Sequence, residues 1–572
     1  MKRIHNVKKT LALILAMMMV LTSTAFANWD SFQGDDLNNG TSETGVTSTN
    51  PNTTTVNLPN NGAFTGVDVE PLVHGSRIYA LYNGGSTTGG NAKDFTDGKV
   101  GGARLAAVDA TSGKLLWSFQ VGAADNVSQL STPVLSKDGK TLYGVYTYTN
   151  NIFPDDFTAK TIDAGKSESV TYKGVKLPGS FSNFQVTTGI MGTGKQTGTV
   201  EIKDSNGKVV QSVDSDSYDG YSFSVYYTDG EAIPEGTYDI TVTIKNSDTK
   251  SVSWTQCKML LNFWQAFKVG NIDTDSPKVS KLKASGAGNA NTPVTFDDSL
   301  IDEILTGGQL YFGIYDGDRA YYQYTLGNDT VEKFKANDGS MGFYNAGAVV
   351  HGENVYFGSE SGRVYIRNAA NFETEGTSKK IADAAIRSSI VLEPFEVDEI
   401  FQGRHLYFTS YNGKLWRVKL HNDTVMEQQG LDLGNTAAEA RSTTTPVVSG
   451  DNVYVATNGS DPTTWAAVGT VKRVTKSFTK DTELTDANTI YNGAGVQCSP
   501  VVFASGREVY VYFTTNVSDG TGYCYRVRSS NGTVTPMWDA PSGNYALQGF
   551  AAGDGFMAFG NDGAEIMIVK NK

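Results

Sequence analysis

Cysteine and histidine are scarce in this chain. Its 572 residues include three cysteines and five histidines, and neither a Cys-x-x-Cys nor a His-x-x-x-His spacing occurs. Structural zinc sites usually carry such spacings, so we expect no bound metal. The chain also lacks a Gly-x-Ser-x-Gly motif and a Gly-rich phosphate loop. The commonest sequence signs of a serine hydrolase or a nucleotide-binding enzyme are therefore missing.

Charged residues are also few. They make up 19% of the chain, against a usual share of ~25%. The 62 glycines, 28 tyrosines and 27 phenylalanines favour many short strands joined by tight turns. This composition excludes a helical bundle, which needs far more Ala, Glu, Lys and Leu. The aromatic content also excludes wholesale disorder. We therefore expect an all-β protein.

Only one long apolar run occurs, and it lies at the start of the chain. Basic residues precede the run Leu11–Leu21, and Ala25–Ala27 supplies a small-x-small cleavage site. The run is shorter than the ~20 residues that a membrane helix needs. Residues 1–27 are therefore predicted to be a signal peptide, with an N-terminal anchor as the alternative. No cysteine follows the cleavage site, as a lipoprotein signal would require. We expect a secreted, extracellular or cell-surface protein without membrane insertion.

The mature chain is expected to be strongly acidic. The full sequence has a formal net charge of −13. Removing the four basic residues of the signal peptide leaves 43 basic and 60 acidic residues, a net charge of −17. Proteins that bind nucleic acids or anionic membranes need clustered Lys and Arg. Neither is an expected partner.

A strand–turn–strand pattern is clear at Ala107–Trp117. An apolar stretch is followed by the turn sequence Asp-Ala-Thr-Ser-Gly and by a second stretch that ends in tryptophan. The Asp109 side chain can accept hydrogen bonds from the backbone of the turn, and Gly113 can adopt a positive φ. The segment therefore predicts a β-hairpin.

A second pattern recurs eight times. Each copy has a small or hydroxyl residue, often followed by proline, then apolar residues, a turn, and an apolar residue followed in all but the last copy by tyrosine. Six of the seven distances between successive copies are 42–62 residues, and the other is 160. The shorter distances fit four-stranded propeller blades. The copies are Glu70–Tyr79, Thr132–Tyr143, Thr292–Tyr311, Gly347–Tyr356, Ser389–Tyr407, Thr445–Tyr454, Ser499–Tyr510 and Gly549–Ala558.

These repeats predict an eight-bladed β-propeller, with seven blades as the alternative count. Packing sheets around a ring buries both faces of each sheet and removes open edges. The last repeat lacks a clear fourth strand, so Thr53–Leu58 is predicted to complete it and close the ring. Residues 28–52 are expected to form an exposed, flexible leader. The propeller is expected to occupy residues 53–160 and 263–572.

The longest distance between copies leaves about 100 additional residues. Alternating strands are predicted there at Gly198–Ile202, Tyr221–Tyr227 and Gly236–Ile244. They predict an inserted Ig-like or jelly-roll β-sandwich over residues 161–262. Four of its aromatic side chains could stack on sugar rings, with packing in the core as the alternative role: Tyr218, Tyr221, Tyr226 and Trp254.

The repeats resemble those of the pyrroloquinoline-quinone-type propeller family, which includes quinoprotein dehydrogenases and a bacterial outer-membrane-assembly scaffold. The likeness rests on Ala107–Trp117 and on the repeated Thr/Ser-Pro-Val-Val openings. Trp29–Gly34 also resembles the Trp-x-x-Phe-x-Gly entry of exported members. The resemblance covers most of residues 53–150 and 263–572 and implies the propeller fold.

Both known activities of this family depend on features that the sequence does not carry. The resemblance implies that a quinoprotein enzyme would have an aspartate base, Asn and Glu ligands for Ca²⁺, and an adjacent cysteine pair. No vicinal cysteine pair occurs, and no spacing singles out such an aspartate. We therefore expect no cofactor. The assembly scaffold is a lipoprotein, whereas this chain has no lipid-accepting cysteine after its predicted signal.

The candidate binding site is the mouth of the central channel, where loops that enter the innermost strands converge. The candidate residues are Gln129, Arg387, Arg441 and Gln497. The two arginines could hold an anionic ligand or a partner's carboxylate, or they could hydrogen-bond to loop backbone. A pairing of Cys498 with Cys524 would be compatible with an oxidising compartment, with two buried thiols as the alternative.

Two classes of function follow. The first is a monomeric binding or scaffold protein of the cell envelope or extracellular space, which engages a protein or glycan through the propeller faces and the sandwich. The alternative is an enzyme, either quinone-dependent or carbohydrate-active. The sequence favours the first class, because no set of catalytic residues stands out.

Overall fold

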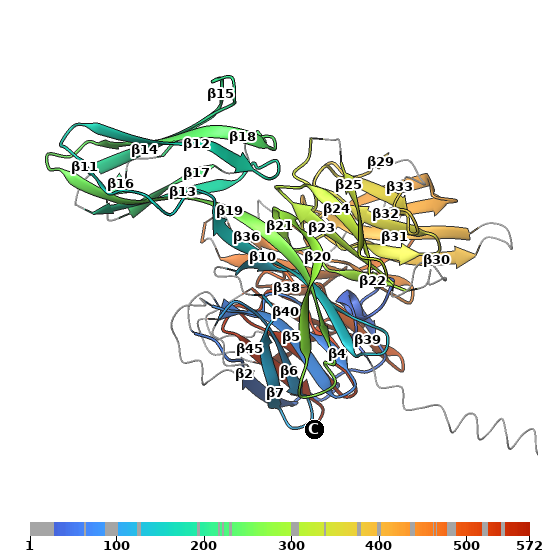
Figure 1. Cartoon of the computed structure of the whole chain (residues 1–572). Helices are drawn as coiled ribbons and strands as arrows, with labels where there is room; N and C mark the ends of the chain where they lie inside the picture. Colours follow the sequence, from blue (N-terminus) through green and yellow to red (C-terminus); the bar gives the residue numbers. More distant parts are fainter. Residues whose placement is uncertain are drawn as a thin grey trace, which may run out of the picture.

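The structure is a computed structural model of the whole chain (Figure 1). It describes residues 28–61, 65–85, 101–122, 127–191, 195–215, 218–219, 222–227, 231–298, 308–336, 339–373, 379–396, 402–434, 441–461, 463–464, 466–477, 488–516, 524–538 and 544–572. The predicted signal peptide lies outside these residues. Within the described ranges, no helix is long and apolar enough to cross a membrane.

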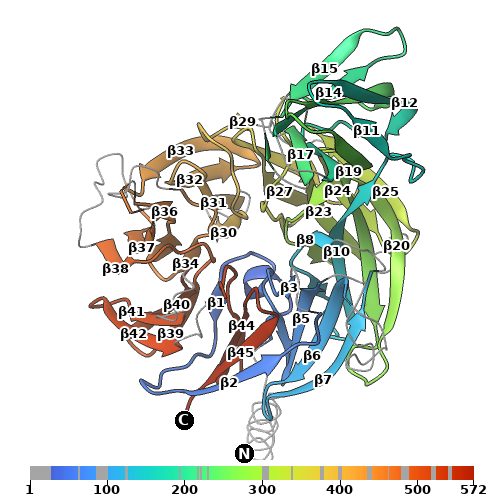
Figure 2. The same ribbon diagram turned by 90° about the vertical axis from the view of Figure 1, so that its left-hand side faces the viewer.

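The regular secondary structure of the described chain is almost entirely β-strand. Eight of its sheets are antiparallel meanders that follow one another along the sequence, and Figure 2 shows them arranged around a common centre. The first sheet contains β3 (Thr65–Gly66), β4 (Leu72–His74), β5 (Arg77–Gly84), β6 (Ala103–Asp109) and β7 (Lys114–Gln120). The second contains β8 (Val127–Leu130), β9 (Val134–Leu135), β10 (Thr141–Asn151), β19 (Val252–Gly270) and β20 (Lys278–Ala287).

The next four sheets repeat this plan. The third contains β21 (Asn289–Ala290), β22 (Thr295–Asp297), β23 (Gln309–Tyr315), β24 (Ala320–Thr325) and β25 (Thr330–Lys335). The fourth contains β26 (Val349–His351), β27 (Asn354–Gly358), β28 (Arg363–Asn368) and β29 (Lys379–Lys380). The fifth contains β30 (Val391–Glu396), β31 (Gln402–Ser410), β32 (Lys414–His421) and β33 (Thr424–Asp432). The sixth contains β34 (Val447–Ser449), β35 (Asn452–Ala456), β36 (Gly459–Ser460), β37 (Ala467–Thr475) and β38 (Thr489–Gly493).

The last two sheets bring the chain back to its start. The seventh contains β39 (Val501–Ser505), β40 (Glu508–Thr514), β41 (Cys524–Arg528) and β42 (Thr533–Trp538), and the eighth contains β43 (Ala551–Gly553), β44 (Phe556–Gly560) and β45 (Glu565–Lys570). In the eighth sheet the outer position is taken by β2 (Asn52–Asn57), which pairs antiparallel with β45. This is the place where the sequence predicts the closing strand.

The repeated sequence pattern has one structural meaning throughout. In every copy the short apolar opening leads into an innermost strand, and in the seven copies with an apolar-Tyr pair this pair lies in the strand that follows it. The tyrosines of these pairs are mostly buried, as at Tyr79, Tyr311 and Tyr356. In the predicted hairpin, Asp109 Oδ1 accepts a hydrogen bond from Ser112 N at 2.6 Å, and Gly113 has a φ of 67°. Local turn chemistry thus sets the register of β6 against β7.

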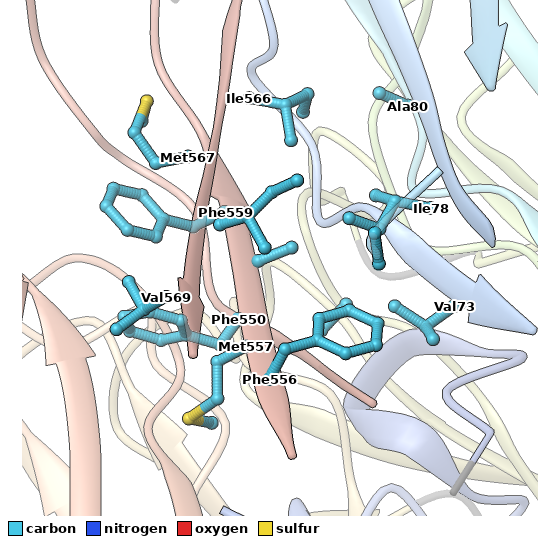
Figure 3. Close-up of a cluster of buried hydrophobic side chains, with 14 of the residues drawn as sticks. Val73, Ile78, Ala80, Phe550, Phe556, Met557, Phe559, Ile566, Met567 and Val569 are labelled. Carbon is cyan, nitrogen blue, oxygen red and sulfur yellow. The ribbon is translucent and has the colours of Figure 1, made fainter. Parts of the chain in front are cut away.

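Apolar side chains from neighbouring sheets form the cores between them. Figure 3 shows one such core, in which Val73 and Ile78 from the first sheet lie opposite Phe556 and Ile566 from the eighth. All four side chains are buried. Packing between the first and last sheets therefore supplements the β2–β45 pairing, and both contacts close the ring.

The leader is packed against the ring, so the expectation of an exposed, flexible segment is wrong for the described residues 28–51. It contains the short 3₁₀ turn η1 (Phe32–Gly34) and β1 (Thr41–Ser42), which pairs parallel with β39. Trp29 and Val46 are buried. The leader hydrogen-bonds to innermost strands or the residues beside them in most of the sheets, for example from Asn38 Nδ2 to Ala348 O at 2.9 Å.

The extra residues after β10 form two sheets that pack face to face and project from the ring (Figure 1). One contains β12 (Ser167–Leu177), β14 (Lys195–Lys203), β15 (Val209–Asp214), β16 (Tyr218–Asp219) and β18 (Gly236–Asn246). The other contains β11 (Lys160–Ile162), β13 (Phe184–Met191), β17 (Ser222–Tyr227) and the first half of β19. The predicted boundary at residue 262 falls inside β19, because this 19-residue strand continues into the second sheet of the ring.

Candidate functional site

A cavity of about 360 Å³ lies where the segments before the innermost strands converge. Its size is at the lower end of the range for small-molecule sites, ~300–1,000 Å³. Segments from seven of the eight ring sheets contribute to the lining, which is dominated by neutral polar side chains. The carboxamides are Asn83, Gln129, Asn291, Asn345, Gln497 and Gln548, and the hydroxyl residues are Ser128, Thr132, Thr443, Thr445 and Ser499.

Several of these carboxamides have unused hydrogen-bonding groups. Gln129 Oε1 is buried and has no partner. Among the described residues, the side chains of Asn345, Gln497 and Gln548 also make no hydrogen bond. Asn83 differs, because its Nδ2 donates to Val127 O at 3.1 Å and its Oδ1 accepts from Gly85 N at 3.0 Å. The four free carboxamides can therefore offer both donors and acceptors to a molecule in the cavity.

The leader lies beside the innermost strands of the ring. Its hydrogen bonds go to residues of these strands or next to them, such as Val502 N to Gly40 O at 2.9 Å and Leu135 N to Asp30 O at 2.8 Å. Phe32, in η1, also contributes to the cavity lining. The leader therefore forms part of the lining of the site.

A buried carboxylate holds the start of the leader. Glu70 Oε1 accepts hydrogen bonds from Trp29 Nε1 at 2.6 Å and from Gln33 N at 3.0 Å. The Trp29 ring lies over Gly34, where a methyl group in place of hydrogen would come within 2.5 Å of it. The sequence Trp-x-x-Phe-x-Gly thus has a physical basis in this chain, since Gly34 also has a φ of 79°.

Replacing Glu70 with glutamine is expected to remove part of the pH dependence of stability. Complete burial raises the pKa of Glu70 from 4.5 to about 7, although the hydrogen bonds from Trp29 and Gln33 oppose this rise. The pKa of Glu70 is higher in the folded than in the unfolded state. Glu70 therefore contributes its full stabilisation below pH 4.5, and this contribution is lost as the pH rises through 7. This contribution to the free energy of unfolding is about 3 kcal/mol, at 1.36 kcal/mol per pKa unit.

The measurement is the free energy of unfolding in urea between pH 4.5 and pH 8. The wild type should lose more stability over this range than Glu70→Gln does, by about 3 kcal/mol. The exposed Glu427 on β33 provides the control variant Glu427→Gln, whose curve should follow that of the wild type. If the stability of Glu70→Gln and of the wild type changed with pH in the same way, a raised pKa of Glu70 in the folded state would be contradicted.

The two predicted channel arginines lie beside the cavity and outside its lining. Arg387 Nε and Nη2 donate to Glu360 at 2.9 and 2.7 Å, and its guanidinium stacks on Tyr344 and Tyr411 at 4.8 and 4.3 Å from the ring centres. Arg441 Nη1 donates to Tyr411 Oη at 2.8 Å. The expectation of an anion site at Arg387 is therefore wrong, because Glu360 already pairs with its charge.

The other two predicted channel residues, Gln129 and Gln497, do line the cavity. Sequence reasoning missed Asp68, Asn345 and Gln548. A positional signal was available, because Asp68, Asn345, Arg387, Thr443 and Gln497 all lie three residues before the second residue of their repeat copies. Equivalent positions in a ring of repeats converge on its axis.

Of the predicted sugar-stacking aromatics, the structure describes the side chains of Trp254 and Tyr226, and it does not bring these two together as one surface. Trp254 is fully buried between the two projecting sheets, and its Nε1 donates to Gln256 O at 2.7 Å. The stacking role is therefore wrong for Trp254. Tyr226 is 60% exposed and accepts a hydrogen bond from Gln185 Nε2 at 3.2 Å. Tyr221 and the side chain of Tyr218 lie outside the described part of the structure.

The three cysteines, Cys257, Cys498 and Cys524, are buried free thiols. The suggested pairing of Cys498 with Cys524 is therefore absent from this structure. Cys498 Sγ accepts a hydrogen bond from Thr514 N at 3.2 Å. Burial raises the pKa of Cys498 to about 11 and that of Cys524 well above its ordinary value. Both thiols should react poorly in the folded protein, because the thiolate is the reactive form.

No protein-family model matches the chain, and no curated protein matches it in sequence. Solved structures with some likeness include BamB from Moraxella catarrhalis, with 11% identity, 55% of this chain and 80% of that chain covered, and a TM-score of 0.32. A europium-containing methanol dehydrogenase has 9% identity, covers 95% and 98% of the two chains, and has a TM-score of 0.41. The WD40 β-propeller domain of Doa1 has 12% identity, 54% and 86% coverage, and a TM-score of 0.30. At these scores the likeness carries no argument about binding or activity.

Proposed function

We propose that this chain is an exported binding protein of the cell envelope or extracellular space that holds the end of a glycan in its channel cavity. In this proposal the eight ring sheets are the blades of a propeller of the pyrroloquinoline-quinone-like repeat type. The projecting pair of sheets is an inserted Ig-like β-sandwich, which gives the protein a second surface. The mature protein acts without a catalytic step.

The observation that carries the proposal is the set of free carboxamides in a cavity whose lining is mostly neutral. Gln129, Asn345, Gln497 and Gln548 line one space and have no protein partner among the described residues. Each carboxamide presents a donor and an acceptor side by side, as sugar hydroxyl groups also do. Oε1 of Gln129 is buried, and buried polar groups are normally hydrogen-bonded. A polyhydroxylated ligand would satisfy this atom and would also offer hydrogen bonds to the other three carboxamides.

The same lining favours binding over glycoside hydrolysis. Hydrolysis of a glycosidic bond usually needs two carboxyl groups that face the scissile bond from opposite sides. Asp68 is the one carboxylate among the described residues of the lining. The other polar groups there are amides and hydroxyls, which orient a ligand and have little capacity to transfer protons at neutral pH.

Substitution of the free carboxamides tests the proposal. The wild type is first screened on an array of neutral and amine-bearing oligosaccharides, and the best-retained oligosaccharide is titrated by calorimetry. Gln129→Leu and Gln497→Leu should each weaken its binding about two- to tenfold, because each removes hydrogen bonds worth about 0.5–1.5 kcal/mol. Gln428→Leu, at an exposed glutamine of β33, should leave the affinity unchanged.

Two outcomes would contradict the proposal. One is the failure of every oligosaccharide, neutral or amine-bearing, to bind. The other is a bound glycan that Tyr226→Ala releases and Gln497→Leu does not, which would place the binding site on the projecting sheets.

A further inference from the structure

The cavity contains one charged side chain without a counter-ion. Asp68 lies between β3 and β4, lines the cavity and is open to the water in it. Within the described part of the chain it makes no hydrogen bond or ion pair. All other described side chains of the lining are neutral at pH 7. A ligand therefore meets a wall of amides and hydroxyls with a single negative charge on one side.

A second carboxylate strengthens this charge. Gly66 lies between the two acidic residues: a methyl group placed on it would be 2.8 Å from Asp68 Oδ1 and 3.1 Å from Asp562 Cα. Asp562 Oδ1 accepts a hydrogen bond from Tyr545 N at 2.7 Å. Burial, together with the charge of Asp562, raises the pKa of Asp68 to about 6. Asp68 is thus mostly ionised at pH 7, and it faces the cavity without a protein partner among the described residues.

Among the described residues that line the cavity, none is a cation that could pair with Asp68. Arg387, the arginine that stacks on the lining residue Tyr344, forms a two-fold hydrogen-bonded ion pair with Glu360. The mature chain has a net charge of −17, and such an excess attracts cations to a concave site. A cationic group of a ligand would therefore meet Asp68 without competition from a described lining residue.

We propose that the cavity selects sugars that carry a free amine, with the ammonium group on Asp68 and the sugar hydroxyls on the surrounding carboxamides. A hydrogen bond between an ammonium and a carboxylate is about twice as strong as one between neutral groups. It would also give Asp68 the partner that it lacks among the described residues. This inference rests on the proposed function of the cavity as a glycan site and names the class of glycan.

The test compares two probes of equal length, a glucosamine oligosaccharide and its fully N-acetylated form. Both are titrated into the mature protein by calorimetry at pH 7.0 and low salt. The wild type should bind the amine form at least tenfold more tightly than the acetylated form. Asp68→Asn should abolish this preference and leave the affinity for the acetylated form within about twofold.

A charge-matched control separates the local effect from the overall charge. Asp554 is exposed in the turn between β43 and β44 of the eighth sheet, and Asp554→Asn removes the same charge away from the cavity. This variant should keep the full preference for the amine form, and the preference should weaken as salt is added. Thermal unfolding of Asp68→Asn checks that the variant is folded.

The outcomes distinguish this inference from the proposed function. Equal binding of the two probes by the wild type would overturn the inference and leave the cavity as a site for neutral glycans. A preference that persists in Asp68→Asn would also overturn it, because the attraction would then come from the net charge. Failure of every oligosaccharide to bind would instead reject the proposed function itself.

Discussion

Replacing Trp29 with alanine should lower the free energy of unfolding by about 3–5 kcal/mol, the usual cost of removing a fully packed tryptophan. The side chain is only 2% exposed and packs in the core shared by the first and eighth sheets. The substitution would also remove one of the hydrogen bonds to the buried carboxylate of Glu70. A segment that resembles a flexible leader in sequence is thus expected to contribute a large share of the stability.

Equilibrium unfolding in urea at pH 8 measures this effect, because Glu70 is then mostly ionised and most dependent on its hydrogen-bond donors. Trp29→Phe should lose less stability than Trp29→Ala, since it keeps much of the packing and removes only the Nε1 donor. Tyr226→Ala is the control, because an exposed aromatic should change stability by no more than ~0.5 kcal/mol. Equal stability of Trp29→Ala and Tyr226→Ala would mean that the leader does not hold the ring.

Val56→Asp should destabilise the protein by about 3–5 kcal/mol by opening the ring at its closing strand. Val56 is buried in the core between the first and eighth sheets, opposite Ile566 in the β2–β45 pair. An aspartate there would place an unpaired charge in an apolar core, which costs several kcal/mol. Detachment of β2 would also expose the edge of β45.

The neighbouring residue supplies a matched control. Thr55 lies on the same strand with its side chain exposed, so Thr55→Asp should change stability by no more than ~0.5 kcal/mol. Denaturation midpoints compare the two variants, and hydrogen exchange should show faster exchange at the amides of β45 in Val56→Asp only. The same loss of stability in both variants would contradict a closing role for the buried face of β2.

The strands were largely predictable because their signals are local. An apolar residue followed by tyrosine, preceded by a Gly-containing turn, specifies the second strand of each sheet wherever it recurs. The Asp109–Gly113 turn carries its own capping and positive-φ residues. Each of these features depends on residues a few positions apart, so a single sequence contains the whole pattern.

The leader was misjudged because its polar residues act at long range. Ser, Thr, Asn and Gly are typical of exposed segments. Here Asn38 Nδ2 donates to Ala348 O and Ile390 O, and Thr44 Oγ1 donates to Gly553 O. These acceptors lie more than 300 residues away in sequence, and they meet only because the ring brings the innermost strands together.

Only part of the candidate site could be predicted from the sequence. Position in the repeat correctly placed Gln129 and Gln497 in the cavity. It could not show that Glu360 pairs with Arg387, or that Asp562 lies near Asp68. A charge is free or paired according to its neighbours in space, and the spacing of residues along the chain does not contain that information.

By itself, then, the sequence determined the all-β character, the repeated strands and the strand that meets the end of the chain. These follow from the alternation of apolar and polar residues, from turn residues and from the spacing of the repeats, all of which can be recognised in short segments of the chain. Only the tertiary structure decided that the leader packs against the ring, that Trp254 is a core residue, and that one carboxylate faces a ring of free carboxamides. Those outcomes depend on burial and on electrostatic partners, both of which are set when distant segments pack together.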